Sequence, residues 1–415
     1  MPSPESAPTR SAAPAYLVRG SRAYVRANWG LFLAGFSTFW LLYCVQPLLP
    51  LLAQDFGVTP AVSSLALSLS TGFLAVAIVM AAVVSEGLGR KGVMFASLLA
   101  TSTLTIATAI APNWHMLLLI RAVEGIALGG VPAVAMAYLA EEMEPAGLGL
   151  AMGLYVAGTA FGGMAGRVAT GMLTQAFGWR WALGVMGMEG LAAAVGFLIL
   201  LPRSCNFIPR PGFDPAYHLR AWAGHLATPG LPLLFAIGGL SMGSFVTLYN
   251  YAGFHLTAPA YGLGQAQLGL IFTVYVFGMA SSPLAGWLAD RIGRRAVLPI
   301  GIALTATGVV ISLAQPLWAV VGGIAMVTFG FFFAHSIASG WVGMRAKGAK
   351  GHASSLYLLA YYVGSSVAGS VGGWFWSAHG WPGVAGFVLL LLALALAAAL
   401  RLARPARTIP MRQSD

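Results

Sequence analysis

Long apolar runs alternate with short polar segments along this chain. Twelve runs are long enough to be considered as helices: 29–50, 61–84, 93–111, 114–138, 148–174, 181–201, 230–254, 265–288, 296–314, 316–341, 353–377 and 382–402. A bilayer core of about 30 Å needs about 20 apolar residues in helical form, whereas a transmembrane β-barrel is built from short segments of alternating polarity. The pattern therefore predicts an all-α polytopic membrane protein with twelve transmembrane helices.

The composition excludes a soluble protein. The 415 residues are 58% hydrophobic and 8% charged, whereas soluble globular proteins carry about 25% charged residues. So few charges could not cover the surface of a soluble chain of this length. A net charge of +11 would indicate a nucleic-acid partner in a soluble protein. In a membrane protein, an excess of cytoplasmic Lys and Arg is the first explanation, and we expect no nucleic-acid partner.

The basic residues also predict the orientation. Residues 1–28 lead into the first run without a small-residue cleavage site, which favours a cytoplasmic tail over a secretory signal. With that tail inside, every basic residue except Arg121, Arg167 and Arg180 falls in a cytoplasmic segment, which is 19 of 22. The positive-inside rule then predicts a multi-pass protein of the inner (cytoplasmic) membrane with both termini in the cytoplasm.

A weak internal repeat predicts two domains. Gly89-Arg90-Lys91 follows the second run and Gly293-Arg294-Arg295 follows the eighth, an offset of 204 residues. Phe177-Gly178-Trp179 and His379-Gly380-Trp381 are likewise related, at an offset of 202 residues. Two sets of six runs at a near-constant offset are typical of a duplicated bundle. We expect an N-terminal tail over 1–28, a six-helix bundle over 29–201, a cytoplasmic linker over 202–229, a second six-helix bundle over 230–402 and a tail over 403–415. The linker is either a short interfacial helix or a simple connection.

Small residues recur at four-residue spacing in the second, fifth, eighth and eleventh runs. Those of the last three runs include Gly158, Gly162, Gly166, Gly278, Gly286, Gly369 and Gly373. Four residues make about one helical turn, so each series forms a smooth face that allows close helix approach. Because the faces fall on the second helix of each triplet, we expect them at the interface between the two bundles. Static packing inside each bundle is the alternative.

The eighth run ends in Gly286, Asp290, Arg291, Gly293, Arg294 and Arg295, which are spaced as Gly-xxx-Asp-Arg-x-Gly-Arg-Arg, and a degenerate copy after the second run contains Glu86 and Arg90. This spacing resembles the loop signature of the major facilitator superfamily. The resemblance extends over residues 29–402 and is closest to the twelve-helix drug:proton antiporter and sugar-efflux-like branch. The segment around Arg121 and Glu124 resembles the fourth-helix motif, with Glu in place of Gln. The series that ends at Arg167 resembles the fifth-helix antiporter motif without its proline.

The resemblance implies that the loop motifs close the cytoplasmic side by contacts between the two bundles. The residues concerned are Glu86, Arg90, Asp290, Arg291, Arg294 and Arg295. The alternative is that these charges only anchor the topology at the lipid surface.

Four formally charged residues lie inside the predicted helices. They are Arg121, Glu124, Arg167 and Glu189. A charge at the centre of a transmembrane helix costs at least about 2.5–3.5 kcal/mol, so each needs a partner or water. At about 1.5 Å per residue all four lie in the outer half of the first bundle, and we expect one buried network. It either holds the helices together or couples transport to protons, with Glu124 as the proton carrier and Arg121 as its modulator.

The resemblance implies a substrate cavity between the bundles, lined chiefly by the first, fourth, seventh and tenth helices. The candidate lining residues are Trp40, Tyr43, Gln46, Tyr249, Asn250, Tyr275, Phe332, His335 and Tyr361. Aromatic side chains with a few neutral hydrogen-bonding groups suit an amphiphilic or neutral substrate. Packing or lipid contact is the alternative for each of them.

Together these features predict a secondary active transporter that exports a small amphiphilic or neutral compound in exchange for protons by alternating access. A proton-coupled sugar or metabolite transporter working in either direction is the alternative. A membrane enzyme would need an acid–base or nucleophile constellation in a loop, and a sensor would need a signalling tail. Glycine-rich nucleotide motifs and clustered metal ligands are absent from the sequence, so we expect no enzyme activity, cofactor or metal, and a monomer in the lipid bilayer.

Overall fold

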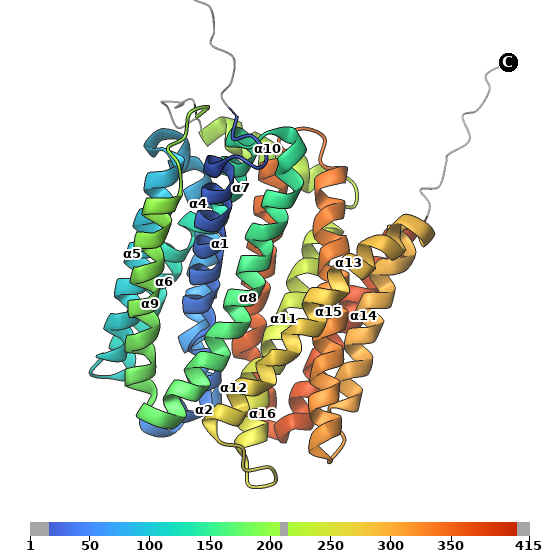
Figure 1. Ribbon diagram of the computed structural model, residues 1–415. Coiled ribbons are helices and arrows are strands. Elements are labelled where there is room, and N and C mark those ends of the chain that lie inside the picture. Colours follow the sequence, from blue (N-terminus) through green and yellow to red (C-terminus); the bar gives the residue numbers. More distant parts are fainter. Residues whose placement is uncertain (1–15, 208–214, 405–415) are drawn as a thin grey trace, which may run out of the picture.

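The computed structural model describes residues 16–207 and 215–404, and these residues are almost entirely helical. The first half contains a tightly packed group of helices (Figure 1). Its elements are α1 (Arg22–Tyr43), η1 (Gln46–Leu48), α2 (Leu49–Asp55), α3 (Pro60–Ser63), α4 (Leu65–Leu88), α5 (Arg90–Ala109), α6 (Trp114–Leu128), α7 (Gly130–Glu142), α8 (Pro145–Phe177) and α9 (Trp179–Leu200).

The second half forms a matching group, and one helix connects the two. The connecting helix is α10 (Pro215–Ala227). The second group consists of α11 (Leu231–Thr257), α12 (Gln265–Ile271), η2 (Phe272–Val274), α13 (Tyr275–Ile292), α14 (Arg294–Ile311), α15 (Leu317–Arg345) and α16 (Lys350–Ala403). We refer to the groups as the N-terminal and C-terminal bundles.

Eleven helical stretches of the described chain are long and apolar enough to cross a membrane. The last of them, α16, has 54 residues and contains Gly380 with φ 59° and ψ −143°. A straight helix of that length would extend about 80 Å, far more than a bilayer core of about 30 Å. The positive φ, which glycine adopts readily, reverses the chain and divides α16 into two crossings. Eleven stretches plus this division give the twelve helices predicted from the sequence.

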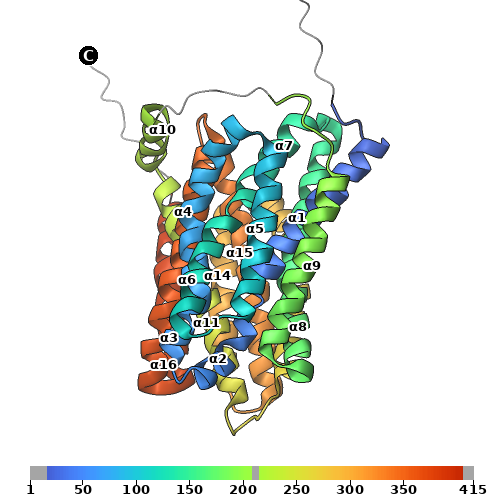
Figure 2. The same ribbon diagram turned by 90° about the vertical axis from the view of Figure 1, so that its left-hand side faces the viewer.

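The two bundles lie side by side, with α1–α9 on one side and α11–α16 on the other (Figures 1 and 2). The beginning of α1, the end of α16 and the connecting helix α10 lie at one end of the molecule, which we call the terminal end. The opposite end, which carries α2 and α12, is called the distal end. An even number of crossings places both ends of the described chain on the same side.

The bundles contact one another in their distal halves. Gly171 of α8 crosses Gly269 of α12 so closely that a Cβ atom on Gly171 would lie 2.8 Å from the Gly269 Cα atom. Between α4 and α16, the Ser366 hydroxyl donates a hydrogen bond of 2.6 Å to the carbonyl of Ser68. Towards the terminal end α13 leans away from α8 (Figure 1), and among the described residues no atom of another helix lies within 4 Å of a Cβ atom built on Gly286. The structure is therefore closed at its distal end.

The predicted interbundle position of the glycine faces is wrong for α8 and α13. In α16, Gly373 approaches Ala61 of α3 across the interface, whereas Gly369 lies closest to Asn250 and Val246 of α11 in its own bundle and also approaches Ser68 of α4. In contrast, the faces on α8 and α13 pack inside their own bundles: Gly158, Gly162 and Gly166 against α1, and Gly278 against Phe332. Spacing identifies a smooth face but not the helix it meets, and in α8 that face accommodates the backbone of α1.

Candidate functional site

A buried ion pair lies on α6. Arg121 donates a hydrogen bond of 2.6 Å from Nη1 to Oε2 of Glu124, and both residues have no exposed surface. The three-residue separation places both side chains on the same face of the helix. The second carboxylate oxygen of Glu124 accepts a hydrogen bond of 2.9 Å from the hydroxyl of Thr105 in α5. Both oxygens of this carboxylate thus have partners inside the bundle.

Arg121 also connects three helices. Its Nε donates to the carbonyl of Ala66 in α4 over 2.9 Å, and its Nη2 donates to the carbonyl of Leu42 in α1 over 3.0 Å. Leu42 lies in the last turn of α1, where backbone carbonyls lack regular helical partners. A movement of α1 or α4 would therefore change the surroundings of the Arg121–Glu124 pair directly.

Arg167 occupies a different environment on α8. Its Nε donates to Oε1 of Gln46 over 2.6 Å, and its Nη1 donates to the carbonyl of Gly163 over 2.6 Å. The guanidinium carbon lies 4.1 Å from the centroid of the Tyr43 ring, 4.9 Å from that of Tyr275 and 5.0 Å from that of Phe272. Arg167 is 2% exposed. The two salt bridges of the described chain, Arg90–Glu141 and Arg121–Glu124, do not include it.

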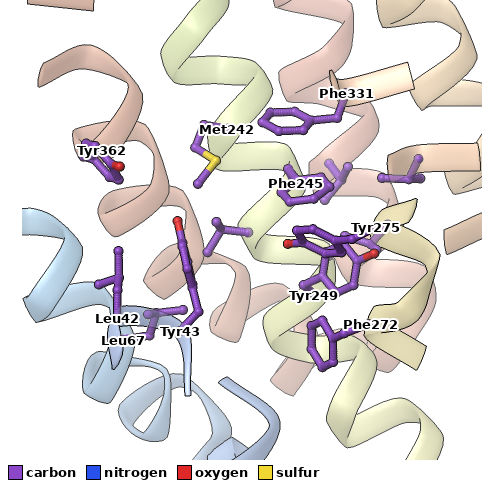
Figure 3. Packing of buried hydrophobic residues seen from close by; sticks show 14 of the residues in the cluster. Leu42, Tyr43, Leu67, Met242, Phe245, Tyr249, Phe272, Tyr275, Phe331 and Tyr362 are labelled. Atoms are coloured by element: carbon purple, nitrogen blue, oxygen red, sulfur yellow. The ribbon is translucent and has the colours of Figure 1, made fainter. Parts of the chain in front are cut away.

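This arginine lies at the seam between the bundles. The Nε2 of Gln46 donates a hydrogen bond of 2.7 Å to Oδ1 of Asn250 in α11, so one chain of hydrogen bonds runs from Arg167 into the C-terminal bundle. Phe272 and Tyr275 also belong to the C-terminal bundle. Figure 3 shows Tyr43 facing the group formed by Tyr249, Tyr275 and Phe272.

The prediction of one four-membered charge network is wrong. Arg121 pairs with Glu124, Arg167 bonds to neutral groups, and Glu189 is exposed on the surface of α9. The neighbouring Met186 and Gly190, on another face of that helix, are buried. The depth of a residue along a helix, which was the basis of the prediction, does not specify the direction of its side chain.

Four predicted cavity residues, Tyr43, Gln46, Asn250 and Tyr275, surround the Arg167 site or continue its hydrogen-bond chain. Tyr249 lies beside them: its ring stacks on Phe272 with centroids 5.1 Å apart, and its hydroxyl is 2.6 Å from that of Thr328. A cavity of about 10 Å³ adjoins Gln46, Tyr249 and Phe272, which is space for about one water molecule.

The remaining predicted cavity residues form no hydrogen bond or cation–π contact with Arg167 in the part of the chain that the structure describes. The Phe332 ring meets the Tyr275 ring edge-on at 5.7 Å. His335 accepts or donates a hydrogen bond of 2.9 Å with the Tyr357 hydroxyl and lies 4.9 Å from the ring of Tyr361. Trp40 is buried against Gly166 and 5.1 Å from the Phe36 ring, so it packs α1 against α8.

The family model of the Major Facilitator Superfamily matches residues 31–260 and 233–412 of this chain. The chain belongs to the major facilitator superfamily. It is 45% identical over 389 residues to the inner membrane transport protein YnfM of Escherichia coli, which covers 94% of this chain and 93% of YnfM. It is 43% identical over 381 residues to the MFS-type transporter YybF of Bacillus subtilis, covering 92% of this chain and 94% of YybF.

Solved structures of the superfamily share the fold. A bacterial homolog of the human lysosomal transporter Spinster, in an inward-facing and unoccupied conformation, superposes with a TM-score of 0.73 at 15% identity. The match covers 93% of this chain and 98% of the homolog. The protein is thus a multi-pass membrane transporter of the MFS type, and its relatives and fold indicate transport rather than enzyme activity.

The superfamily loop motifs lie at the terminal end and do not join the bundles in the described part of this structure. Arg90 forms an ion pair of 2.6 Å with Glu141 of its own bundle. Arg291 stacks on Trp287 with its guanidinium carbon 3.9 Å from the ring centroid. Asp290 and Arg295 are exposed and Arg294 is half-buried, whereas the side chain of Glu86 lies outside the described part of the structure. A role as a gate would require a state in which the terminal end closes.

Three contributors to the site were missed by the sequence analysis: Thr105, Phe272 and the Gly171–Gly269 crossing beside Arg167. Thr105 lies in the threonine-rich third run. The threonines of this run were the signal that a hydroxyl group could bond to a charged residue in the next helix. Phe272 carried no signal, because one phenylalanine in an apolar run resembles any other.

Proposed function

We propose that this transporter couples the export of a small amphiphilic compound to proton entry by alternating access. Under the positive-inside rule its terminal end faces the cytoplasm and its distal end faces outward across the inner membrane. The present conformation, with the bundles in contact at the distal end, would then be inward-facing. The loop-motif charges Asp290, Arg294 and Arg295 would close the cytoplasmic side in the opposite state.

The buried Arg121–Glu124 pair is the observation that carries the proton coupling. A carboxylate without access to water is more easily protonated, whereas an adjacent arginine stabilises its charged form. Arg121 is also bonded to the backbone carbonyls of Leu42 and Ala66. Displacement of these helices would change how closely Arg121 holds Glu124. Proton binding and conformational change can thus influence one another.

The test combines a resistance screen with reconstituted transport. The protein is expressed in a bacterial host that lacks its own exporters, and the compound that it confers resistance to is taken into proteoliposomes that contain a pH-sensitive dye. Wild-type protein should show proton movement that depends on the compound. Glu124→Gln should abolish this movement and retain binding of the compound, because glutamine preserves the shape of the side chain but cannot take up a proton.

Glu189→Gln is the matched control, since this carboxylate is exposed on the outer surface of α9. It should behave like the wild type. Full pH-driven transport by Glu124→Gln would contradict the proposed coupling. Proton movement with sugars alone would assign the protein to the sugar or metabolite transporters instead.

A further inference from the structure

We propose that the transported compound carries a single negative charge and that its anionic group binds Arg167 at the seam between the bundles. This inference rests on the proposed transport function, because it assigns the substrate class of the same interbundle site. Its test measures binding in the absence of any gradient, so the two can fail separately.

The charge balance of the membrane interior is the first argument. Among the described buried side chains in the central part of the bundles, the formal charges are those of Arg121, Glu124 and Arg167. The first two neutralise one another at 2.6 Å. Arg167 remains as one positive charge without a carboxylate partner among the described residues. Buried charges in proteins are normally paired, and a charge inside a membrane protein is expensive to keep, which points to a function.

The hydrogen-bond directions are the second argument. Arginine has five N–H donors and no acceptor, and in the described chain Arg167 uses two of its donors, towards Gln46 and Gly163. Because Gln46 must present its oxygen to this donor, its NH₂ group faces Asn250, which in turn must present its oxygen. The Nδ2 of Asn250 is consequently left buried without an acceptor among the described residues. N–H donors therefore remain unused at both ends of this chain of three side chains, on Arg167 and on Asn250. A ligand rich in hydrogen-bond acceptors complements such a site.

The surroundings specify the rest of the ligand. Apart from Gln46 and Gly163, Arg167 faces the rings of Tyr43, Phe272 and Tyr275. These π faces hold a guanidinium less strongly than a carboxylate does, so an incoming anion can replace them. The rings then contact the body of the ligand, which favours an apolar or aromatic group. A second negative charge on the ligand would find no second unpaired cation nearby among the described side chains, so we restrict the class to monoanions.

The position of the site suits alternating access. Gln46 and Arg167 belong to the N-terminal bundle, whereas Asn250, Phe272 and Tyr275 belong to the C-terminal bundle. A ligand bound at Arg167 would therefore contact both bundles and respond to their relative movement, as expected for a transporter of this architecture.

The experiment compares three naphthalene compounds of nearly equal shape: naphthoate, its neutral amide naphthamide, and the cation naphthylmethylamine. Their dissociation constants are measured by calorimetry on the purified full-length protein near neutral pH. Wild-type protein should bind naphthoate on the order of tenfold more tightly than naphthamide, the effect of one charge-assisted hydrogen-bond pair. Naphthylmethylamine should bind most weakly.

Arg167→Gln should remove the preference for naphthoate, whereas Arg167→Lys should keep part of it. Arg180→Gln is the control, because Arg180 is exposed and bonded to the carbonyls of Ala109 and Ala111 outside the site. It should bind like the wild type. Equal affinities for naphthoate and naphthamide in the wild type, or no binding of naphthoate, would overturn the inference and leave proton-coupled export of neutral compounds standing.

A second variant distinguishes loss of the binding site from misfolding of Arg167→Gln. Gln46→Glu keeps the shape of the side chain and replaces its amide with a carboxylate. One oxygen of this carboxylate takes the place of Oε1 of Gln46, which lies 2.6 Å from Nε of Arg167. This internal anion should compete with the ligand and reduce the naphthoate preference to the level of Arg167→Gln, while thermal unfolding shows an intact fold. An undiminished preference in Gln46→Glu would overturn the inference. A naphthoate preference in a protein without proton movement would instead contradict the proposed function.

Discussion

Gln46 and Asn250 are joined by a hydrogen bond of 2.7 Å across the bundle interface, and they are 204 residues apart. The same offset separates Gly89-Arg90-Lys91 from Gly293-Arg294-Arg295. The two amides therefore occupy equivalent positions in the internal repeat. The hydrogen bond thus joins two residues that the pseudo-symmetry of the bundles relates to one another. Because this bond joins the two bundles, we expect it to break when they separate at the distal end and to contribute to the distal closure.

Asn250→Leu should shift the protein towards opening at the distal end. The substitution removes the acceptor for Gln46 and leaves the bonds of Arg167 in place. Loss of one buried hydrogen bond of about 1 kcal/mol corresponds to a roughly fivefold change in the equilibrium between the two states. Ala53 and Ala258 line a distal cavity of about 390 Å³. Spin labels attached at Ala53→Cys and Ala258→Cys should lie further apart in Asn250→Leu than in the wild type, as measured by electron paramagnetic resonance.

This measurement uses a Cys205→Ser background, because Cys205 is exposed and Cys44 is buried. The control is Thr257→Val in the same helix as Asn250, since it removes a hydroxyl that bonds only within α11 among the described contacts. That variant should leave the distance distribution unchanged. Identical distributions for Asn250→Leu and the wild type would show that the amide pair does not contribute to distal closure.

The Arg121–Glu124 pair should show strong energetic coupling. Arg121→Met leaves the Glu124 carboxylate buried beside Thr105 alone, and breaking a buried pair in this way costs roughly 3–5 kcal/mol. The double variant Arg121→Met/Glu124→Leu should recover much of the loss, because it leaves no buried charge at this position and the Thr105 hydroxyl still bonds to the Thr101 carbonyl. Thermal unfolding of the wild type, both single variants and the double variant completes the cycle. Additive effects of the two substitutions would contradict a coupled pair.

Two glycines of α8 should respond oppositely to alanine. A Cβ atom on Gly162 would collide with the carbonyl of Phe36 in α1. Gly153 is exposed, and no atom of another helix in the described chain lies within 4 Å of the corresponding position. Gly162→Ala should lower the unfolding temperature because α1 and α8 must move apart. Gly153→Ala should be neutral or stabilising by up to about 1 kcal/mol, since alanine favours helix. A tolerated Gly162→Ala would mean that the α1–α8 contact is looser than the structure indicates.

The fold was predictable from the sequence because it depends on coarse properties. Twelve apolar runs and their flanking charges survive boundary errors of a few residues, and the loop motif around Asp290 resembles the signature of the superfamily whose family model matches both halves of the chain. The charged residues inside the helices could also be identified from the sequence, since charges in apolar runs are rare.

The grouping of those charges was not predictable from depth alone. Arg167 and Glu189 have similar estimated depths, yet one side chain points into the seam and the other points away from its bundle. Partners such as Gln46 and Asn250 lie far apart in sequence, and only the packing of the two bundles brings them together. The prediction for the glycine face of α8 was wrong for a similar reason. The spacing of its glycines is the same whether the neighbouring helix is α1 or a helix of the other bundle.

A disulfide between the bundles should arrest transport reversibly. A Cβ atom on Gly72 of α4 would lie 3.4 Å from Cβ of Ser366 in α16, close to the separation of about 3.5–4.5 Å that disulfides require. Gly72→Cys/Ser366→Cys in the Cys205→Ser background should therefore crosslink under mild oxidation. Because the bond holds the distal halves together, transport should stop on oxidation and return on reduction, while each single cysteine variant stays active. Continued transport by the crosslinked protein would contradict alternating access through separation of α4 and α16, since these helices could then not part during the cycle.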